Sequence, residues 1–134
     1  MSPQLPPLVI CETDYDSLFL LSERTAQQLP KVSAFLAAEL ERADVLPVEK
    51  MPNDVVMMRS RAVFRMVDSG TDRTVTLVYP AEADIQKDKL SILTPVGTAL
   101  LGMSAGQTMS WRDRAGATKS LIVKTVLSQP SPSA

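Results

Sequence analysis

Two features of this 134-residue chain restrict the chemistry that its side chains could perform. It contains no histidine, and its single cysteine is Cys11. The missing histidine excludes a Ser-His-Asp triad, a Cys-His pair and a histidine metal site. The glycines are few and scattered, so they form no phosphate-binding loop. We therefore expect a protein that is not an enzyme and that needs no metal ion or cofactor.

Composition also bears on the compartment. A lone thiol cannot form an internal disulfide, which fits a reducing cytoplasm. No apolar run reaches the ~20 residues that a membrane-spanning helix needs. We expect a cytoplasmic protein without a membrane partner.

The charged side chains divide the chain into an acidic front and a mildly basic body. Between Cys11 and Asp44, seven acidic residues stand against three basic ones, whereas residues 54–127 carry seven acidic and ten basic residues. The basic excess is too small for a protein that reads nucleic-acid sequence, which would present a dense basic face. It is enough to orient the molecule on a polarised partner.

Residues 94–102, Thr-Pro-Val-Gly-Thr-Ala-Leu-Leu-Gly, predict a short helix with both ends marked. Thr94 can cap its N-terminus, Pro95 fits the first helical position, and Gly102 can adopt the left-handed conformation beyond its end. These features are sufficient for an ordinary core helix. The turn that enters it is also stiff and apolar, which suits a binding surface. The candidate partner-binding residues are Leu93, Thr94, Pro95 and Val96.

Three arginines form a second candidate surface. Residues 56–66 predict a strand, bent near Ser60, in which Arg59, Arg61 and Arg65 alternate with apolar residues and share one face. Such a face could bind an acidic protein surface or RNA, or it could simply be solvated.

Several motifs occur in a fixed order in the second half: Leu-Ser-Ile at 90–92, the capped helix at 94–102, and Gly-Gln-x-Met-x-Trp at 106–111. This order resembles the C-terminal domain of the GreA/GreB transcript cleavage factors. The run Met-Pro-Asn-Asp-Val-Val-Met-Met-Arg-Ser-Arg at 51–61 is similar, more narrowly, to the Rnk proteins, which are Gre-like regulators of nucleoside diphosphate kinase. The resemblance covers roughly residues 8–127.

The resemblance implies a partner and a place on it. Gre-like proteins bind RNA polymerase, and their loop before the capped helix docks on the β′ subunit at the rim of the secondary channel. The matching residues here are Leu93, Thr94, Pro95 and Val96. A link to nucleoside diphosphate kinase would have to be indirect, because that type of enzyme carries its phosphate on a histidine.

Residues 13–43 predict two helices that Pro30 separates, with apolar residues recurring every three or four positions. The resemblance implies that this hairpin is a shortened form of the Gre coiled coil, whose acidic tip helps to hold a catalytic Mg²⁺. The predicted tip here carries Gln27, Gln28 and Lys31 and no acid, and the hairpin is only about 20–25 Å long. It could touch the channel rim or be a packing element, and we expect it to rest on the body at its base.

The remaining patterns predict an α+β protein. Strands are expected at 56–66, 73–79, 90–93, 108–113 and 118–127, in an antiparallel sheet with one helix. The resemblance implies the FKBP-like fold of Gre C-terminal domains. The expected organisation is a helical hairpin (short coiled coil) at 8–45, a linker at 46–53, the body at 54–128, and a disordered tail at 129–134.

These inferences converge on a monomeric transcription regulator that binds RNA polymerase and competes with Gre factors without stimulating transcript cleavage. A prolyl isomerase or chaperone with an FKBP-like fold is the alternative from another class, and an interaction module for a different protein is a third. An isomerase needs an aromatic pocket, and the body offers only Phe64, Tyr79 and Trp111.

Overall fold

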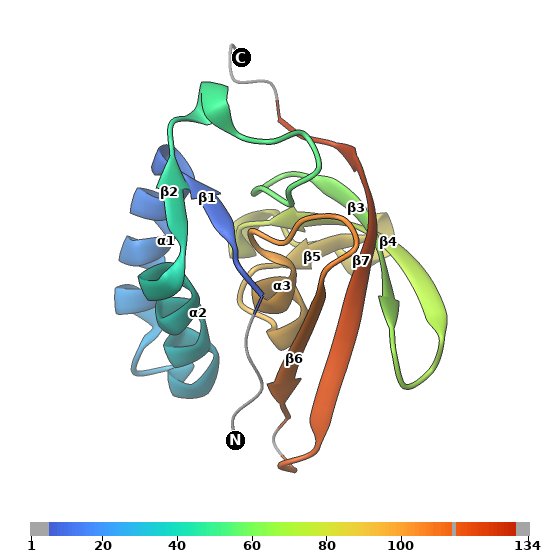
Figure 1. Cartoon of the computed structure of the whole chain (residues 1–134). Helices are drawn as coiled ribbons and strands as arrows, with labels where there is room; N and C mark the ends of the chain where they lie inside the picture. Colours follow the sequence, from blue (N-terminus) through green and yellow to red (C-terminus); the bar gives the residue numbers. More distant parts are fainter. Residues whose placement is uncertain (1–5, 114, 131–134) are drawn as a thin grey trace.

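The computed structural model of the chain describes residues 6–113 and 115–130. A pair of helices, α1 (Glu12–Thr25) and α2 (Pro30–Arg42), lies beside a curved five-stranded sheet, with the short helix α3 (Pro95–Leu100) between them. Figure 1 shows this arrangement, with α1 on the side away from the sheet. The expected α+β class is confirmed.

The first strand pairs with the strand that follows the helix pair. Strand β1 (Val9–Cys11) runs parallel to β2 (Asp44–Leu46), with Ile10 opposite Val45. This ladder joins the two open ends of the helix pair. The sequence analysis predicted no strand here, because three-residue strands are too short to show a period.

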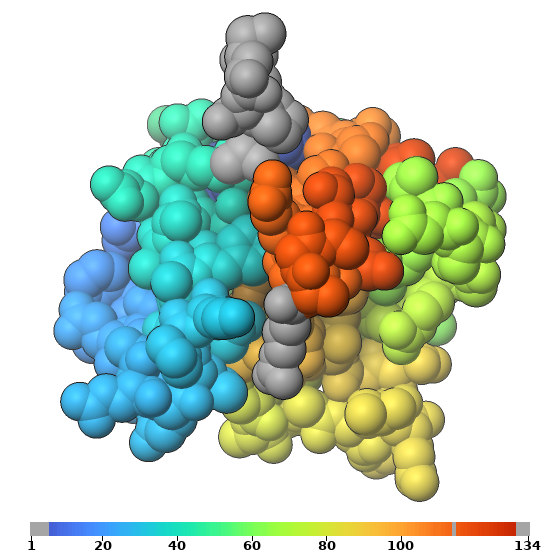
Figure 2. All heavy atoms as spheres, turned by 90° about the horizontal axis from the view of Figure 1, so that it is seen from below, coloured from blue at the N-terminus to red at the C-terminus, as the bar shows by residue number. Residues whose placement is uncertain are grey.

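The helix pair packs against the body along its length, and not only at its base. Leu18, Leu36 and Leu40 are buried in the same apolar core as the sheet residue Phe64. Helix α2 contacts α3 directly. Viewed from the end that carries the α1–α2 turn, the helices lie flat against the rest of the molecule (Figure 2). The contact extends beyond the base at which it was expected, because α2 presents an apolar face that needs cover.

The sheet has the order β5-β4-β3-β7-β6. Its strands are β3 (Arg61–Met66), β4 (Thr71–Val78), β5 (Lys89–Ser91), β6 (Thr108–Arg112) and β7 (Thr118–Ser128). Strands β4, β3, β7 and β6 pair antiparallel in that order, as expected, but β5 runs parallel to β4. This parallel pairing is possible because two 3-10 turns, η2 (Pro80–Glu82) and η3 (Ile85–Lys87), follow β4. They return the chain to Thr76, where the β4–β5 ladder begins.

The pairing of β3 with β7 shifts register twice, between Arg61 and Ala62 and between Val63 and Phe64. Such irregularities bend strands and increase their twist. The bend curves the sheet toward α3, whose residues Ala99 and Leu100 are buried in the core. The core is aliphatic apart from Phe64; its largest members are Leu8, Ile10, Leu18, Leu36, Met58, Leu77, Ile92, Leu100, Leu101, Met103 and Met109.

The segment before β3 is not the strand that alternation predicted. Residues 55–58 are all buried, so no face is left for solvent. After a 3-10 turn, η1 (Val48–Lys50), this segment pairs instead with the chain beyond α3: the Val56 amide donates to the Met103 carbonyl at 2.9 Å, and the Gly102 amide donates to the Val56 carbonyl at 2.8 Å. The regular strand therefore begins only at Arg61.

The end of the chain returns to the same segment. The Gln129 side-chain amide donates to the carbonyls of Pro52 and Val55 at 2.7 and 2.8 Å. Gln129 was expected in the disordered tail, and here it holds the segment before β3. Residues 131–134 of that tail lie outside the described residues.

Candidate functional site

The turn from β5 into α3 is held by its own side chains. Thr94 caps the helix, because its Oγ1 accepts a hydrogen bond from the Gly97 amide at 3.0 Å and donates one to the Ser91 carbonyl at 2.8 Å. The Ser91 hydroxyl accepts from the Leu93 amide at 3.0 Å. The predicted cap and the proline at the helix start are confirmed. The turn thus has several local hydrogen bonds that restrict its conformation.

A second set of contacts ties this turn to the sheet. The Ile92 amide donates to the Val78 carbonyl at 2.9 Å, and the Thr98 hydroxyl donates to the Ile92 carbonyl at 2.7 Å. Ile92 and Thr98 are both fully buried. The turn is therefore a rigid part of the fold and not a free loop.

Gly97 is needed where the turn and the helix meet. A Cβ at this position would overlap the Ser91 carbonyl oxygen and would lie 2.9 Å from Thr94 Oγ1. The sequence analysis gave this glycine no role, because a close approach between backbone segments cannot be read from a sequence.

The four candidate residues lie together at the surface. Pro95 is exposed, and Leu93, Thr94 and Val96 are half-buried, with the two aliphatic side chains packed against the core. The arrangement presents a small apolar surface on a rigid support, so that little conformational entropy is lost when a partner covers it.

The end of α3 is fixed by the N-terminal segment. Gly102 adopts a left-handed φ of 74°, as its position beyond the helix predicted. A Cβ on Gly102 would lie 2.9 Å from the Leu8 side chain and 3.0 Å from the Val9 carbonyl oxygen. The Val9 amide donates to the Gly102 carbonyl at 3.1 Å. Strand β1 therefore crosses directly over the end of α3.

The arginine surface differs from its prediction. Arg61 and Arg65 share a face of β3, but Arg59 lies outside the strand with a left-handed φ of 66°. Two of the three are paired: Arg59 contacts Glu82 at 3.0 Å, and Arg65 contacts Asp72 at 2.6 Å. The prediction that the three arginines share one face is therefore wrong. The two ion pairs also reduce the positive charge that Arg59 and Arg65 offer to a partner.

Arg59 belongs instead to a polar cluster between α1 and the body. Its guanidinium lies 5.3 Å from the centre of the Tyr79 ring. Asp14 on α1 accepts a hydrogen bond from the Met58 amide at 3.2 Å. Burial raises the pKa of Asp14 although the Cys11 thiol, the Met58 amide and Arg59 oppose the change. Burial and the nearby Asp14 charge also raise the pKa of Tyr79 to about 12.

The sequence analysis missed this cluster. Cys11, the single cysteine of the chain, is buried and free. The contact between Asp14 and Met58 joins residues 44 positions apart, so no local pattern indicates it. Its effect is to attach α1 to the segment before β3.

The turn of the helix pair carries Gln27, Gln28 and Lys31, all exposed, with Lys31 already in α2. Glu23, near the end of α1, is exposed. Glu39, the first carboxylate of α2, is 2% exposed and lies near the end of the helix that is away from the turn. Burial raises the pKa of Glu39, and its ion pair with Arg42 at 2.9 Å opposes that rise.

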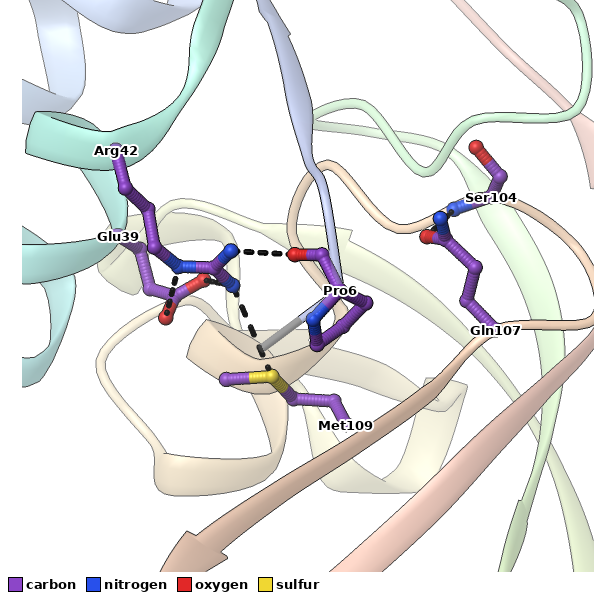
Figure 3. A network of polar contacts seen from close by, with 6 residues as sticks. All are labelled: Pro6, Glu39, Arg42, Ser104, Gln107 and Met109. Carbon is purple, nitrogen blue, oxygen red and sulfur yellow. Dashed lines mark hydrogen bonds and ion pairs between the residues drawn. The ribbon is translucent and has the colours of Figure 1, made fainter. Parts of the chain in front are cut away.

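Figure 3 shows what this ion pair holds. The Arg42 guanidinium also donates to the Pro6 carbonyl and approaches the Met109 sulfur at 3.9 Å. In the same view, the Gln107 side chain accepts from the Ser104 amide at 2.9 Å. Arg42 therefore connects α2, the N-terminal segment and β6, and Glu39 serves this connection.

Within residues 6–113 and 115–130, no group of three or more acidic or cysteine side chains is close enough to hold a metal ion. In the same described ranges, none of the helices is both long and apolar enough to cross a membrane.

Comparisons with known proteins agree with these motifs. The family model for the C-terminal region of GreA/GreB transcription elongation factors matches residues 51–127. The regulator of nucleoside diphosphate kinase of Escherichia coli K12 is 38% identical over 125 residues, which cover 93% of this chain and 92% of that protein.

Two further comparisons concern a GreA factor and a solved structure of the same family. The GreA elongation factor of Syntrophomonas wolfei is 35% identical over 89 residues, covering 66% of this chain and 56% of that factor. The solved structure of a GreA/GreB transcription elongation factor from Nitrosomonas europaea matches with a TM-score of 0.70 and 36% identity, covering 90% of this chain and 98% of that one. The chain therefore belongs to the GreA/GreB-related family and is a member of its Rnk type, the regulators of nucleoside diphosphate kinase.

Proposed function

We propose that this protein is a non-catalytic transcription regulator that binds RNA polymerase at the rim of the secondary channel. The observation that supports this most is the surface formed by Leu93, Thr94, Pro95 and Val96. Its side chains are exposed or half-buried, and its backbone is fixed by the Thr94 cap and by the contact of Ile92 with β4. In the Gre-like proteins that the motifs resemble, the matching loop docks on the β′ subunit.

The hairpin is expected to bring no metal ligands to the polymerase. Mg²⁺ prefers carboxylate oxygens, and the turn between α1 and α2 carries amides and a lysine. Glu39 is committed to Arg42. We infer that the protein occupies the channel entrance as a cytoplasmic monomer, competes there with Gre factors, and does not stimulate transcript cleavage.

The test of binding is co-purification with core RNA polymerase. The variant Pro95→Asp should abolish binding, because it places a charge in the centre of the apolar surface, while an acidic residue in the first turn of a helix is compatible with folding. Pro80→Asp is the matched control, since Pro80 is also an exposed proline at the start of a helical turn.

The expected result is retained binding for Pro80→Asp and loss for Pro95→Asp, with unchanged circular dichroism spectra for both. If Pro95→Asp binds like the unaltered protein, the proposed surface is wrong.

Arg61 is proposed as an auxiliary contact to an acidic surface of the partner. It is exposed on β3, whereas Arg59 and Arg65 are engaged with Glu82 and Asp72. Charge reversal by Arg61→Glu should weaken binding mainly at low ionic strength, because salt screens contacts between exposed charges. If Arg61→Glu binds like the unaltered protein at both low and high salt, Arg61 is merely a solvated side chain.

A prolyl isomerase is disfavoured by the aromatic residues. Phe64 is fully buried, so it cannot line a substrate pocket, and Tyr79 packs against the core beneath Arg59. A peptide isomerisation assay should show no acceleration above the uncatalysed rate.

A further inference from the structure

The outer face of α1 carries two large apolar side chains, Phe19 and Leu20, that remain exposed. Phe19 is 46% exposed and Leu20 is 53% exposed, whereas Leu18 and Ser22 of the same helix are buried. Tyr15, which is half-buried and also packs against the core, stacks on Phe19 with ring centres 6.4 Å apart. Tyr15, Phe19 and Leu20 line a shallow hollow together with Asp16. Exposed apolar groups that adjoin one another in this way are typical of interaction sites.

The position of α1 leaves this face open. The helix lies at the edge of the molecule, on the side away from the five-stranded sheet (Figure 1). Its inner face makes the contacts with α2 and with the core through Leu18. We call the outer face the α1 patch (Tyr15, Asp16, Phe19 and Leu20). It includes none of the residues of the surface before α3, which we call the α3 surface (Leu93, Thr94, Pro95 and Val96).

Acidic side chains border the α1 patch. Glu12 and Glu23 are exposed within one helical turn of Asp16 and Phe19, and they lie on the same side of the helix. Within the described part of the chain, no ion pair involves Glu12, Asp16 or Glu23. Arg24 is the single basic residue of α1.

The charge decides what can cover the patch. An anionic membrane, a nucleic acid and the α1 patch of a second copy would each bring negative charge against these carboxylates, which is unfavourable. A protein segment with apolar side chains flanked by lysine or arginine would satisfy both the apolar centre and the acidic border. We propose that the α1 patch is a second docking surface, separate from the α3 surface, for a basic amphipathic segment of a protein partner.

The test uses model peptides, so it does not depend on whether the chain binds polymerase. One peptide of about 14 residues has leucine and lysine at helical spacing; its control has glutamate in place of lysine. Each is titrated into the isotope-labelled full chain, and amide chemical shifts are followed by NMR. The lysine peptide should shift residues 12–24 selectively, and the glutamate peptide should shift none.

Three variants locate the contact. Phe19→Ser combined with Leu20→Ser should weaken binding of the lysine peptide by roughly tenfold or more, and Asp16→Lys combined with Glu23→Lys should remove most of its salt dependence. The control is Ile85→Ser, since Ile85 is 87% exposed on η3 and is flanked by the acidic Asp84 and Asp88. It should leave binding unchanged.

The proposal is overturned if the lysine peptide does not bind, if its shifts centre outside α1, or if the Ile85 control weakens binding as much as the α1 variants do. Circular dichroism of each variant establishes that the fold is retained. None of these outcomes bears on co-purification with polymerase, so the two proposals fail separately.

Discussion

Gly97 permits the closest backbone approach at the α3 surface. The α-hydrogen of Gly97 that stands where a Cβ would be faces the Ser91 carbonyl oxygen. Any side chain at this position would have to displace the turn that Thr94 caps. A position with ordinary helical backbone geometry can therefore exclude side chains as strictly as a position with a left-handed backbone.

Gly97→Ala should lower the free energy of unfolding by about 2–3 kcal/mol, since an overlap with backbone cannot be relieved by rotating a side chain. Chemical denaturation measures this change. Gly70→Ala is the control: Gly70 has a φ of 66° but nothing within 4 Å of its Cβ position, so its cost should be only about 1 kcal/mol of backbone strain. Equal losses for the two variants would contradict the argument from close approach.

Asp14 gives a pH-dependent prediction. Because burial raises its pKa in the folded state, the folded protein holds this proton more tightly than the unfolded chain does. The contribution of Asp14 to stability is therefore most favourable below the ordinary carboxyl pKa and declines as the pH rises through the folded-state pKa.

Asp14→Asn removes this decline while keeping an acceptor for the Met58 amide. The variant should be more stable than the unaltered protein at pH 7, and the difference should shrink near pH 3. Denaturation midpoints at the two pH values measure it. A variant that is less stable at pH 7 would show that the Arg59 charge outweighs the cost of burying the carboxylate.

At the scale of elements, helix α2 belongs to the core of the body. Leu36 is fully buried and Leu40 nearly so, and Arg42 extends the attachment to the N-terminal segment and to Met109. The helix pair should therefore not unfold separately from the sheet.

Leu36→Ala should destabilise the whole chain by about 2–4 kcal/mol, in a single transition seen equally by helix-sensitive circular dichroism and by the fluorescence of Trp111 on β6. Leu29→Ala is the control, because Leu29 lies at the turn and is 40% exposed; its cost should be under about 0.5 kcal/mol. Two separated transitions for Leu36→Ala would mean that the helix pair is an independent unit.

The sequence predicted those elements whose signals are local. The ends of α3 were readable because Thr94, Pro95 and Gly102 each act within one or two turns of their own position. The long strands β4 and β7 were readable from alternation and β-forming residues.

Non-local features were not readable. The parallel pairing of β5 depends on where two 3-10 turns place Lys89, and β1–β2 pairing joins residues on either side of the helix pair. The position of Arg59 was misjudged because the alternation in the sequence was taken as one strand from residue 56, whereas residues 55–58 are all buried and the strand begins only at Arg61. The ion pair of Glu39 with Arg42 is local, but the contact of Arg42 with Pro6, 36 residues away, is not.

For the whole molecule, the prediction concerns competition. If the protein occupies the channel entrance without metal ligands, adding it to a stalled transcription complex should slow cleavage stimulated by a Gre factor, and excess Gre factor should restore the rate by mass action. The measurement is the rate of transcript shortening on a gel. Pro95→Asp should have no effect in the same assay, and acceleration of cleavage by the unaltered protein alone would refute the proposed role.

The attachment of the helix pair to the body also determines where the pair could be lengthened. Because the inner side of α2 is packed in the core, additional residues can be inserted most freely in the exposed turn at Gln27 and Gln28. Extra helical turns grafted there would project into solvent while Leu18, Leu36 and Leu40 stayed in place. If the proposed role is correct, such an insertion converts a short competitor into a long probe. Two carboxylates at its new tip would test whether length and acidity alone separate it from a cleavage factor.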